Sequence, residues 1–163
     1  GDDKGMVIPP RIAYNSIVIV PIGFEKDKEI LKQTRVLEKR LKKYNPLIDK
    51  RTDKSPGWKF NEWELVGVPL RLEIGPKDFE KRQVTLVRRD TGVKSQIKIT
   101  EVKEKVAEML DAIQHNLFDK ARKYLQENTI HVNTKKELQA VIEQKKLALV
   151  PWCEDQKCEE GCW

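Results

Sequence analysis

The sequence is poor in the residues that most often indicate a particular chemistry. Its 163 residues include three cysteines, all within the last eleven positions, and two histidines. An odd number of cysteines gathered at one end argues against a secreted scaffold held together by disulfides. No apolar run approaches the roughly 20 residues of a membrane-spanning helix, and no charged and then apolar leader opens the chain. These absences favour a cytoplasmic protein without a membrane partner.

The two histidines do not indicate an active site. His115 falls in an expected long helix, and His131 falls in a short strand-like segment. Neither is accompanied by the Ser, Cys or Asp arrangement that nucleophilic catalysis needs. We expect hydrogen-bonded or exposed structural roles for both side chains.

Charged residues, by contrast, are abundant and make up 36% of the chain. Lys and Arg number 32 against 26 Asp and Glu, which gives a formal net charge of +6. A surplus of this size suits a polyanionic partner, but it serves solubility equally well. With 39% hydrophobic residues, the chain has enough apolar side chains for a core, and its length favours one domain with at most an appendage.

Hydrophobic patterns along the chain predict an α/β fold with a mixed sheet and helices on its faces. Residues 16–22 form a nearly unbroken apolar run, typical of a strand buried on both faces of a parallel sheet. Residues 26–44 have helical spacing, and Ser55-Pro56 and Gly67 are the start and stop signals of a shorter helix. Further strands are expected at 47–51, 68–74, 83–88, 96–99 and 147–150, and further helices at about 100–128 and from a capping box at 134–137.

Acidic and basic residues are most closely interleaved in GWKFNEWELVGVPLRLEIGPKD, residues 57–78. Aliphatic residues alternate with charged ones in the strand expected at 68–74, so the charged side chains should share its outward face. The end of the preceding helix and the turn after the strand add further charges. We expect one rim to gather Glu64, Arg71, Glu73, Lys77 and Asp78.

Such a rim has the chemistry to read unpaired bases. Carboxylates accept hydrogen bonds from base amino and imino groups, and Arg donates two at once to the O6 and N7 atoms of guanine. Lys59 and the basic helix at 26–44 are expected to hold phosphates nearby. The alternative is a solvated salt-bridge cluster, each pair contributing about 0–1 kcal/mol, with the neighbouring aromatic residues in the core. The residues alone therefore leave a basic α/β module, for which RNA binding is one open function.

The stretch SPGWKFNEWELVGVPLRLEIGPKD closely resembles the anticodon-binding domain of prolyl-tRNA synthetases. VRRDTG, GDDKGMVIPPRIA and VPWCEDQKC extend the resemblance over essentially the whole chain, and the last points to the archaeal and eukaryotic-like type. The resemblance implies the class II synthetase anticodon-binding fold, with a mixed five-stranded sheet flanked by helices. It implies that residues 1–14 end a catalytic domain, residues 15–150 form the anticodon-binding domain and residues 151–163 start a truncated or altered zinc module.

The resemblance also implies a function and the residues that perform it. Family members attach proline to its tRNA with ATP and Mg²⁺, and they read two anticodon guanines with an acid-and-base rim. Matched by motif, the expected base readers are Glu64, Arg71, Lys77 and Asp78, with Lys59 nearby on the tRNA-binding surface, Glu73 in a supporting role and Lys94 as a weaker candidate.

The arginine of GMVIPPRIA, Arg11, matches the third signature motif of class II synthetases and is expected to contact the triphosphate of ATP. The first two motifs and the proline pocket are missing from this sequence. The segment alone is therefore predicted to be inactive, within a parent proline–tRNA ligase that acts as a cytoplasmic homodimer.

The cysteines suggest only a partial metal site. Cys153 and Cys158 are separated by four residues, a spacing that permits two thiolates on one zinc ion, but a closed site needs four ligands. Cys162 does not match the second pair expected from the resemblance. Unpaired thiols or a local disulfide are equally open interpretations from the residues themselves.

Two other functions remain open at this point. One is a free-standing α/β module that binds another RNA or an acidic protein. The other is a redox enzyme using Cys153 and Cys158, which is the weakest candidate because the pair is not a Cys-x-x-Cys motif.

Overall fold

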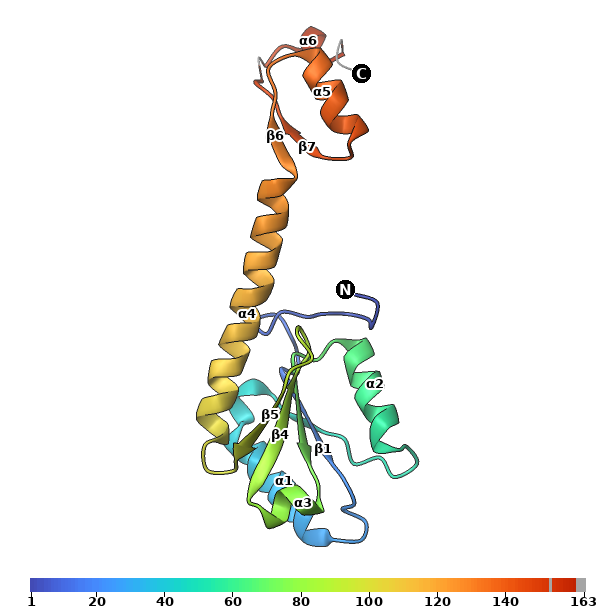
Figure 1. Ribbon diagram of the computed structural model, residues 1–163, viewed down its shortest axis with the longest axis vertical. Helices are drawn as coiled ribbons and strands as arrows, with labels where there is room; N and C mark the ends of the chain where they lie inside the picture. The colour runs from blue at the N-terminus through green and yellow to red at the C-terminus, as the bar shows by residue number, and fades with distance from the viewer. Residues whose placement is uncertain (153, 161–163) are drawn as a thin grey trace. The chain divides into compact units, whose positions relative to one another are not determined.

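The computed structural model describes residues 1–152 and 154–160. The chain forms two compact units, Gly1–Leu117 and Phe118–Trp163 (Figure 1). The division falls within helix α4 (Val102–Glu127). Each unit has a sheet of its own and is described separately below.

The first unit contains the predicted mixed sheet of five strands, in the order β2-β1-β3-β4-β5. The pairs β1–β2 and β1–β3 are parallel, whereas β3–β4 and β4–β5 are antiparallel. The strand bounds are β1 Ile17–Pro21, β2 Leu47–Ile48, β3 Leu70–Ile74, β4 Gln83–Arg88 and β5 Lys94–Lys98. The sheet therefore confirms the mixed topology, and the predicted strand at 147–150 belongs to the other unit.

The helices of the first unit begin and end largely where the sequence signals them. Helix α1 (Lys28–Arg40) stops before residue 44, and a short 3₁₀ helix, η1 (Lys42–Tyr44), follows it. Helix α2 (Pro56–Val66) starts at an N-cap serine, Ser55, and ends at Gly67, whose φ of 84° suits glycine. A five-residue helix, α3 (Pro76–Glu80), follows β3 directly. Within the described ranges, no helix is both long and apolar enough to cross a bilayer.

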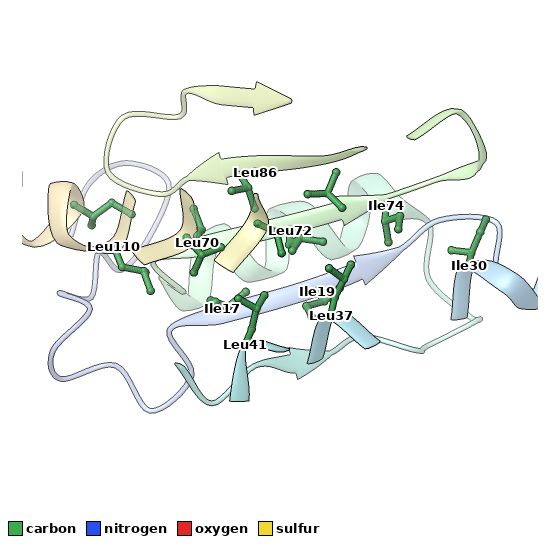
Figure 2. Close-up of a cluster of buried hydrophobic side chains, with 14 residues drawn as sticks. Ile17, Ile19, Ile30, Leu37, Leu41, Leu70, Leu72, Ile74, Leu86 and Leu110 are labelled. Carbon is green, nitrogen blue, oxygen red and sulfur yellow. The ribbon is translucent and has the colours of Figure 1, made fainter. Parts of the chain in front are cut away.

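Both faces of the sheet are covered, which explains the unbroken apolar run of β1. On one face, alternate residues of β1 and β3 pack against α1 and the first half of α4 (Figure 2). On the other face, Val18 and Val20 pack with Val68 against Phe60 and Trp63 of α2. The second face carries the charged residues of β3, so α2 is the helix that positions the candidate site.

The second unit contains two short parallel strands joined by a helix. Strand β6 (Thr129–His131) pairs with β7 (Leu147–Leu149), and helix α5 (Lys135–Glu143) connects them. The predicted capping box is present: the Thr134 hydroxyl accepts a hydrogen bond from the Glu137 backbone N–H at 3.2 Å. Backbone donors at Asn133 and Thr134 in turn lower the pKa of Glu137. Helix α6 (Gln156–Glu160) follows β7.

Candidate nucleic-acid interface

Arg71 lies in β3 at the centre of a group of charges beneath α2. Its Nε donates to the Glu73 carboxylate at 2.9 Å, and its Nη1 donates to Glu64 at 3.2 Å and to the Phe60 carbonyl at 3.3 Å. The guanidinium also lies 4.4 Å from the centroid of the Phe60 ring, a cation–π distance. Glu64, Arg71 and Glu73 are called the acid–base cluster below. Within the described residues, nothing bonds to Nη2 of Arg71.

The prediction that Arg71 and Glu73 face solvent is wrong. They do alternate with Leu70 and Leu72 onto the opposite face of β3, as expected, but α2 lies across that face and Arg71 is only 5% exposed. Buried charges persist only when they are paired, and these two pair with each other. The side chain of Glu64 is 28% exposed and is the part of the cluster most open to solvent.

Lys77 and Asp78 lie apart from this cluster, in the first turn of α3. Asp78 accepts a hydrogen bond from the Gly75 backbone N–H at 3.2 Å, which holds the turn between β3 and α3. Lys77 is exposed, and its ammonium has no ion pair within the described residues. The structure therefore brings three of the five predicted rim residues together and places the other two beyond the carboxyl end of β3.

Lys59 has an internal partner where the sequence predicted a phosphate contact. Its side chain is buried beneath α2, with Nζ 3.7 Å from Oδ1 of Asp49 and 3.4 Å from the Asp49 carbonyl oxygen. Nζ also lies 5.7 Å from the centroid of the Phe24 ring. In this structure the ammonium neutralises a buried carboxylate and does not reach the surface.

That carboxylate, Asp49, is the centre of a second group of charges, which sequence reasoning missed. Arg51 donates to it through Nε at 3.0 Å and Nη2 at 2.6 Å, and the Trp63 Nε1 donates at 2.9 Å. Burial raises the pKa of Asp49, but these hydrogen bonds more than offset burial and leave the pKa at about 2. Arg51 also pairs with Glu62 of α2. Asp49, Arg51, Lys59, Glu62 and Trp63 are called the Asp49 cluster below. It could have been suspected from an acid placed directly after a short strand.

The Asp49 cluster borders an open cavity of about 300 Å³. Its lining combines the cluster with the end of β2 and with α2: Leu47, Ile48, Asp49, Lys50, Arg51, Glu62, Trp63 and Val66. Arg51 lies over two indole rings, 5.2 Å from the centroid of Trp58 and 5.9 Å from that of Trp63. Trp58 is half exposed, whereas Trp63 packs against the core.

Arg89 is a further buried cation that sequence reasoning missed, and it contacts the end of α2. Its Nε donates to the Glu64 carbonyl at 2.8 Å, while Nη1 and Nη2 donate to the Asp2 carboxylate at 2.8 and 2.6 Å. The hydrogen bonds from Arg89 hold the pKa of Asp2 well below its usual range. The motif VRRDTG was noted for its resemblance alone, and its second arginine joins the N-terminal segment to α2.

The remaining predicted residues lie outside these clusters. Arg11 is exposed, and its backbone N–H donates to the Gln114 side chain at 3.2 Å. Lys94 is exposed at the start of β5. Cys153 and Cys162 lie outside the described residues, as does the side chain of Cys158. Among the residues that are described, no group of three or more His, Cys, Asp or Glu side chains is arranged to hold a metal ion.

Comparison with known proteins places this site in a family. Residues 16–109, more than half of the chain, match the family described as anticodon binding domain, and the chain belongs to that family. The matched range contains both clusters beneath α2. It confirms the predicted fold class.

Individual relatives indicate which group of anticodon-binding proteins this chain resembles. The Proline–tRNA ligase of Natranaerobius thermophilus is 45% identical over 98% of this chain, and that of Clostridium botulinum (strain Loch Maree / Type A3) is 42% identical over 98%. The chain spans about a third of these two relatives, 34% of each. A Bifunctional glutamate/proline–tRNA ligase of Cricetulus griseus is 41% identical over 98% of this chain, which covers 11% of that protein. The resemblance to the anticodon-binding segment of prolyl-tRNA synthetases is thereby confirmed.

Proposed function

We propose that this chain binds the anticodon of a proline tRNA, as part of an enzyme that attaches proline to that tRNA. The observation that carries the proposal is the acid–base cluster, in which a partly exposed carboxylate, Glu64, is held beside a buried arginine. It lies in a chain that aligns along 98% of its length with proteins named Proline–tRNA ligase.

The cluster offers the donors and acceptors that a guanine edge requires. A carboxylate such as Glu64 accepts from the N1 imino and N2 amino groups of an unpaired guanine. Arg71 donates to base acceptors through Nη2, while Glu73 fixes its Nε and Glu64 its Nη1. Such fixed partners keep the guanidinium in one orientation, which selects one base edge over another.

Residues outside the cluster complete the proposed interface. Lys77 and Asp78, at the start of α3, supply a second donor and acceptor pair for the neighbouring anticodon base. Lys59 takes a supporting part: its ammonium neutralises Asp49 beneath α2, so its contribution to tRNA binding passes through the position of that helix. This arrangement differs from the direct phosphate contact that the sequence suggested.

The parent enzyme supplies the chemistry of this proposal. The exposed guanidinium of Arg11 would pair with the triphosphate oxygens of ATP, whose Mg²⁺ and proline are held by other parts of the enzyme. We propose that the parent is a cytoplasmic homodimer. Cys153 and Cys158 would supply two of the four ligands of a structural zinc ion, and further ligands must then come from elsewhere.

A binding titration with RNA stem-loops tests the proposed function. The loop should carry the proline anticodon, and matched loops should replace each anticodon guanine in turn by adenine. We expect each replacement to weaken binding by about 1–3 kcal/mol, the usual range for a lost base-edge contact. Binding that depends on salt but ignores the anticodon bases would contradict the proposal and indicate a general polyanion-binding module.

A further inference from the structure

We propose that Arg89 and Asp2 are positioning residues for base reading, because together they hold the last turn of α2 and, with it, Glu64. The inference rests on the function proposed above. It concerns two residues outside the acid–base cluster: Arg89, which directly follows β4 and contacts the backbone of the helix that carries Glu64, and Asp2 of the N-terminal segment, which pairs with Arg89.

The last turn of any α-helix needs partners for its carbonyl groups, since the last four have none within the helix. In α2, the Trp63 carbonyl accepts from the backbone N–H of Gly67 at 3.1 Å, a local bond. The next two carbonyls find donors far away in the chain. The backbone carbonyl of Glu64 accepts a hydrogen bond from Arg89 Nε at 2.8 Å, and that of Leu65 accepts one from the Met6 backbone N–H at 3.0 Å.

The N-terminal segment fits closely against this helix end. Its Gly5 has a φ of 124°, and a Cβ there would lie 2.6 Å from backbone atoms of Leu65. Gly67 also lies close to the segment, since a Cβ there would lie 2.5 Å from the carbonyl oxygen of Met6. Both glycines occupy left-handed conformations that suit glycine, so the contact depends on two positions that tolerate no side chain.

Arg89 uses all three nitrogens of its guanidinium in this arrangement. One donates to the backbone carbonyl of Glu64, and the other two donate to the Asp2 carboxylate. The side chain of Arg89 is buried, whereas that of Asp2 is 46% exposed. A buried cation of this kind needs its carboxylate, because an unpaired charge beneath a helix is strongly unfavourable. Loss of the Asp2 carboxylate should therefore move Arg89 and release the carbonyl it holds.

Glu64 connects Arg89 and Asp2 to the proposed base-reading site. Arg89 holds its backbone carbonyl, while its carboxylate contacts Arg71 at 3.2 Å. Hydrogen bonds to a base edge depend on placement to within about 0.5 Å. A shift of the last helical turn therefore changes the base-reading carboxylate without removing it.

The test compares discrimination between bases, using the full chain and the two kinds of stem-loop described above. The variants are Arg89→Gln and Asp2→Asn. The matched control is Arg88→Gln: Arg88 is the adjacent residue in sequence and makes a similar two-point pair with Asp90, and among the described residues it makes no hydrogen bond or ion pair with α2. Asp2→Glu keeps the carboxylate and serves as the conservative variant.

We expect Arg89→Gln and Asp2→Asn to reduce the ratio of the two affinities about tenfold, which corresponds to one weakened base contact. Arg88→Gln and Asp2→Glu should leave the ratio unchanged. A smaller folded fraction weakens binding to both RNAs alike, so the ratio reports positioning and not stability. If the Arg89→Gln variant does not fold, the affinity ratio of the Asp2→Asn variant tests the inference alone, since the Asp2 side chain is partly exposed.

Two outcomes would overturn the inference, and they are distinguishable. If the unmodified chain does not distinguish guanine from adenine, the proposed function fails and this inference fails with it. If the unmodified chain discriminates and both Arg89→Gln and Asp2→Asn retain the full ratio, Arg89 and Asp2 are purely structural and the proposed function still stands.

Discussion

The acid–base cluster and the Asp49 cluster lie beneath the same helix, and they differ in the charge at their centre: a buried carboxylate in the Asp49 cluster and a buried guanidinium, that of Arg71, in the acid–base cluster. The Asp49 carboxylate is 1% exposed and is surrounded by Arg51, Lys59 and Trp63. The acid–base cluster ends in Glu64, whose side chain is 28% exposed. Similar residue types therefore serve two purposes: a buried acid held by cations fixes the helix to the sheet, and a buried arginine holds a partly exposed carboxylate that can offer hydrogen bonds to a partner.

The largest expected effect is on stability, when the Asp49 cluster loses its central acid. Asp49→Ala leaves two cations and an indole N–H without their acceptor, and we expect a loss of about 3–5 kcal/mol in the free energy of unfolding. Denaturation in urea measures it. The control is Asp53→Ala, an exposed acid paired with Lys54 at 3.3 Å, which should cost about 0–1 kcal/mol. Equal losses in the two variants would contradict the role given to Asp49.

The next effect is on recognition. Glu64→Gln removes the partly exposed charge of the acid–base cluster while Arg71 keeps Glu73, so we expect a loss of about 1–3 kcal/mol in discrimination between guanine and adenine. Glu62→Gln is a closely matched control, because Glu62 lies on the same helix, pairs with an arginine and is 30% exposed. Equal discrimination in the two variants, measured by titration with the stem-loops, would remove the distinction between the clusters.

Acid should weaken the Asp49 cluster in a defined range of pH. The pKa of Asp49 is lowered from 3.8 to about 2 in the folded protein, so its contribution is complete above the unfolded value and is lost as the pH falls toward 2. The free energy of unfolding should therefore fall by about 2 kcal/mol between pH 5 and pH 2. Urea denaturation at successive pH values measures the loss, and Asp49→Asn should flatten that part of the profile. An unchanged profile in the variant would assign the acid sensitivity to other carboxylates.

The smallest effect is expected at Lys77, which belongs to neither cluster. Lys77→Ala should reduce discrimination by about 1 kcal/mol, at the lower end for a base contact, because an exposed ammonium makes a single flexible bond. Stability should change by less than about 0.5 kcal/mol, as for most surface substitutions. A loss of affinity that is the same for every anticodon would instead make Lys77 a phosphate contact.

Much of the fold could be predicted from local signals. The apolar run of β1, the serine and proline at the start of α2, and the capping box of α5 each depend on nearby residues, and each lies where expected. The burial of Arg71 and Glu73 could not be predicted in this way, since alternation shows that two residues share a face but not which helix covers it. The partners of Lys59 and Arg89 were equally hidden: Lys59 pairs with Asp49, ten residues away, and Arg89 with Asp2, 87 residues away.

The central claim is that the Glu64 carboxylate contacts an anticodon guanine. A measurement of the coupling between two changes, one in the protein and one in the RNA, tests this claim most directly. Affinities are needed for the unmodified chain and for Glu64→Gln, each with the guanine loop and with a loop in which inosine replaces one anticodon guanine and so lacks the 2-amino group. If the carboxylate accepts a bond from that group, the two changes should be coupled by about 1 kcal/mol or more at one of the two guanines. Strictly additive effects at both guanines would contradict the claim.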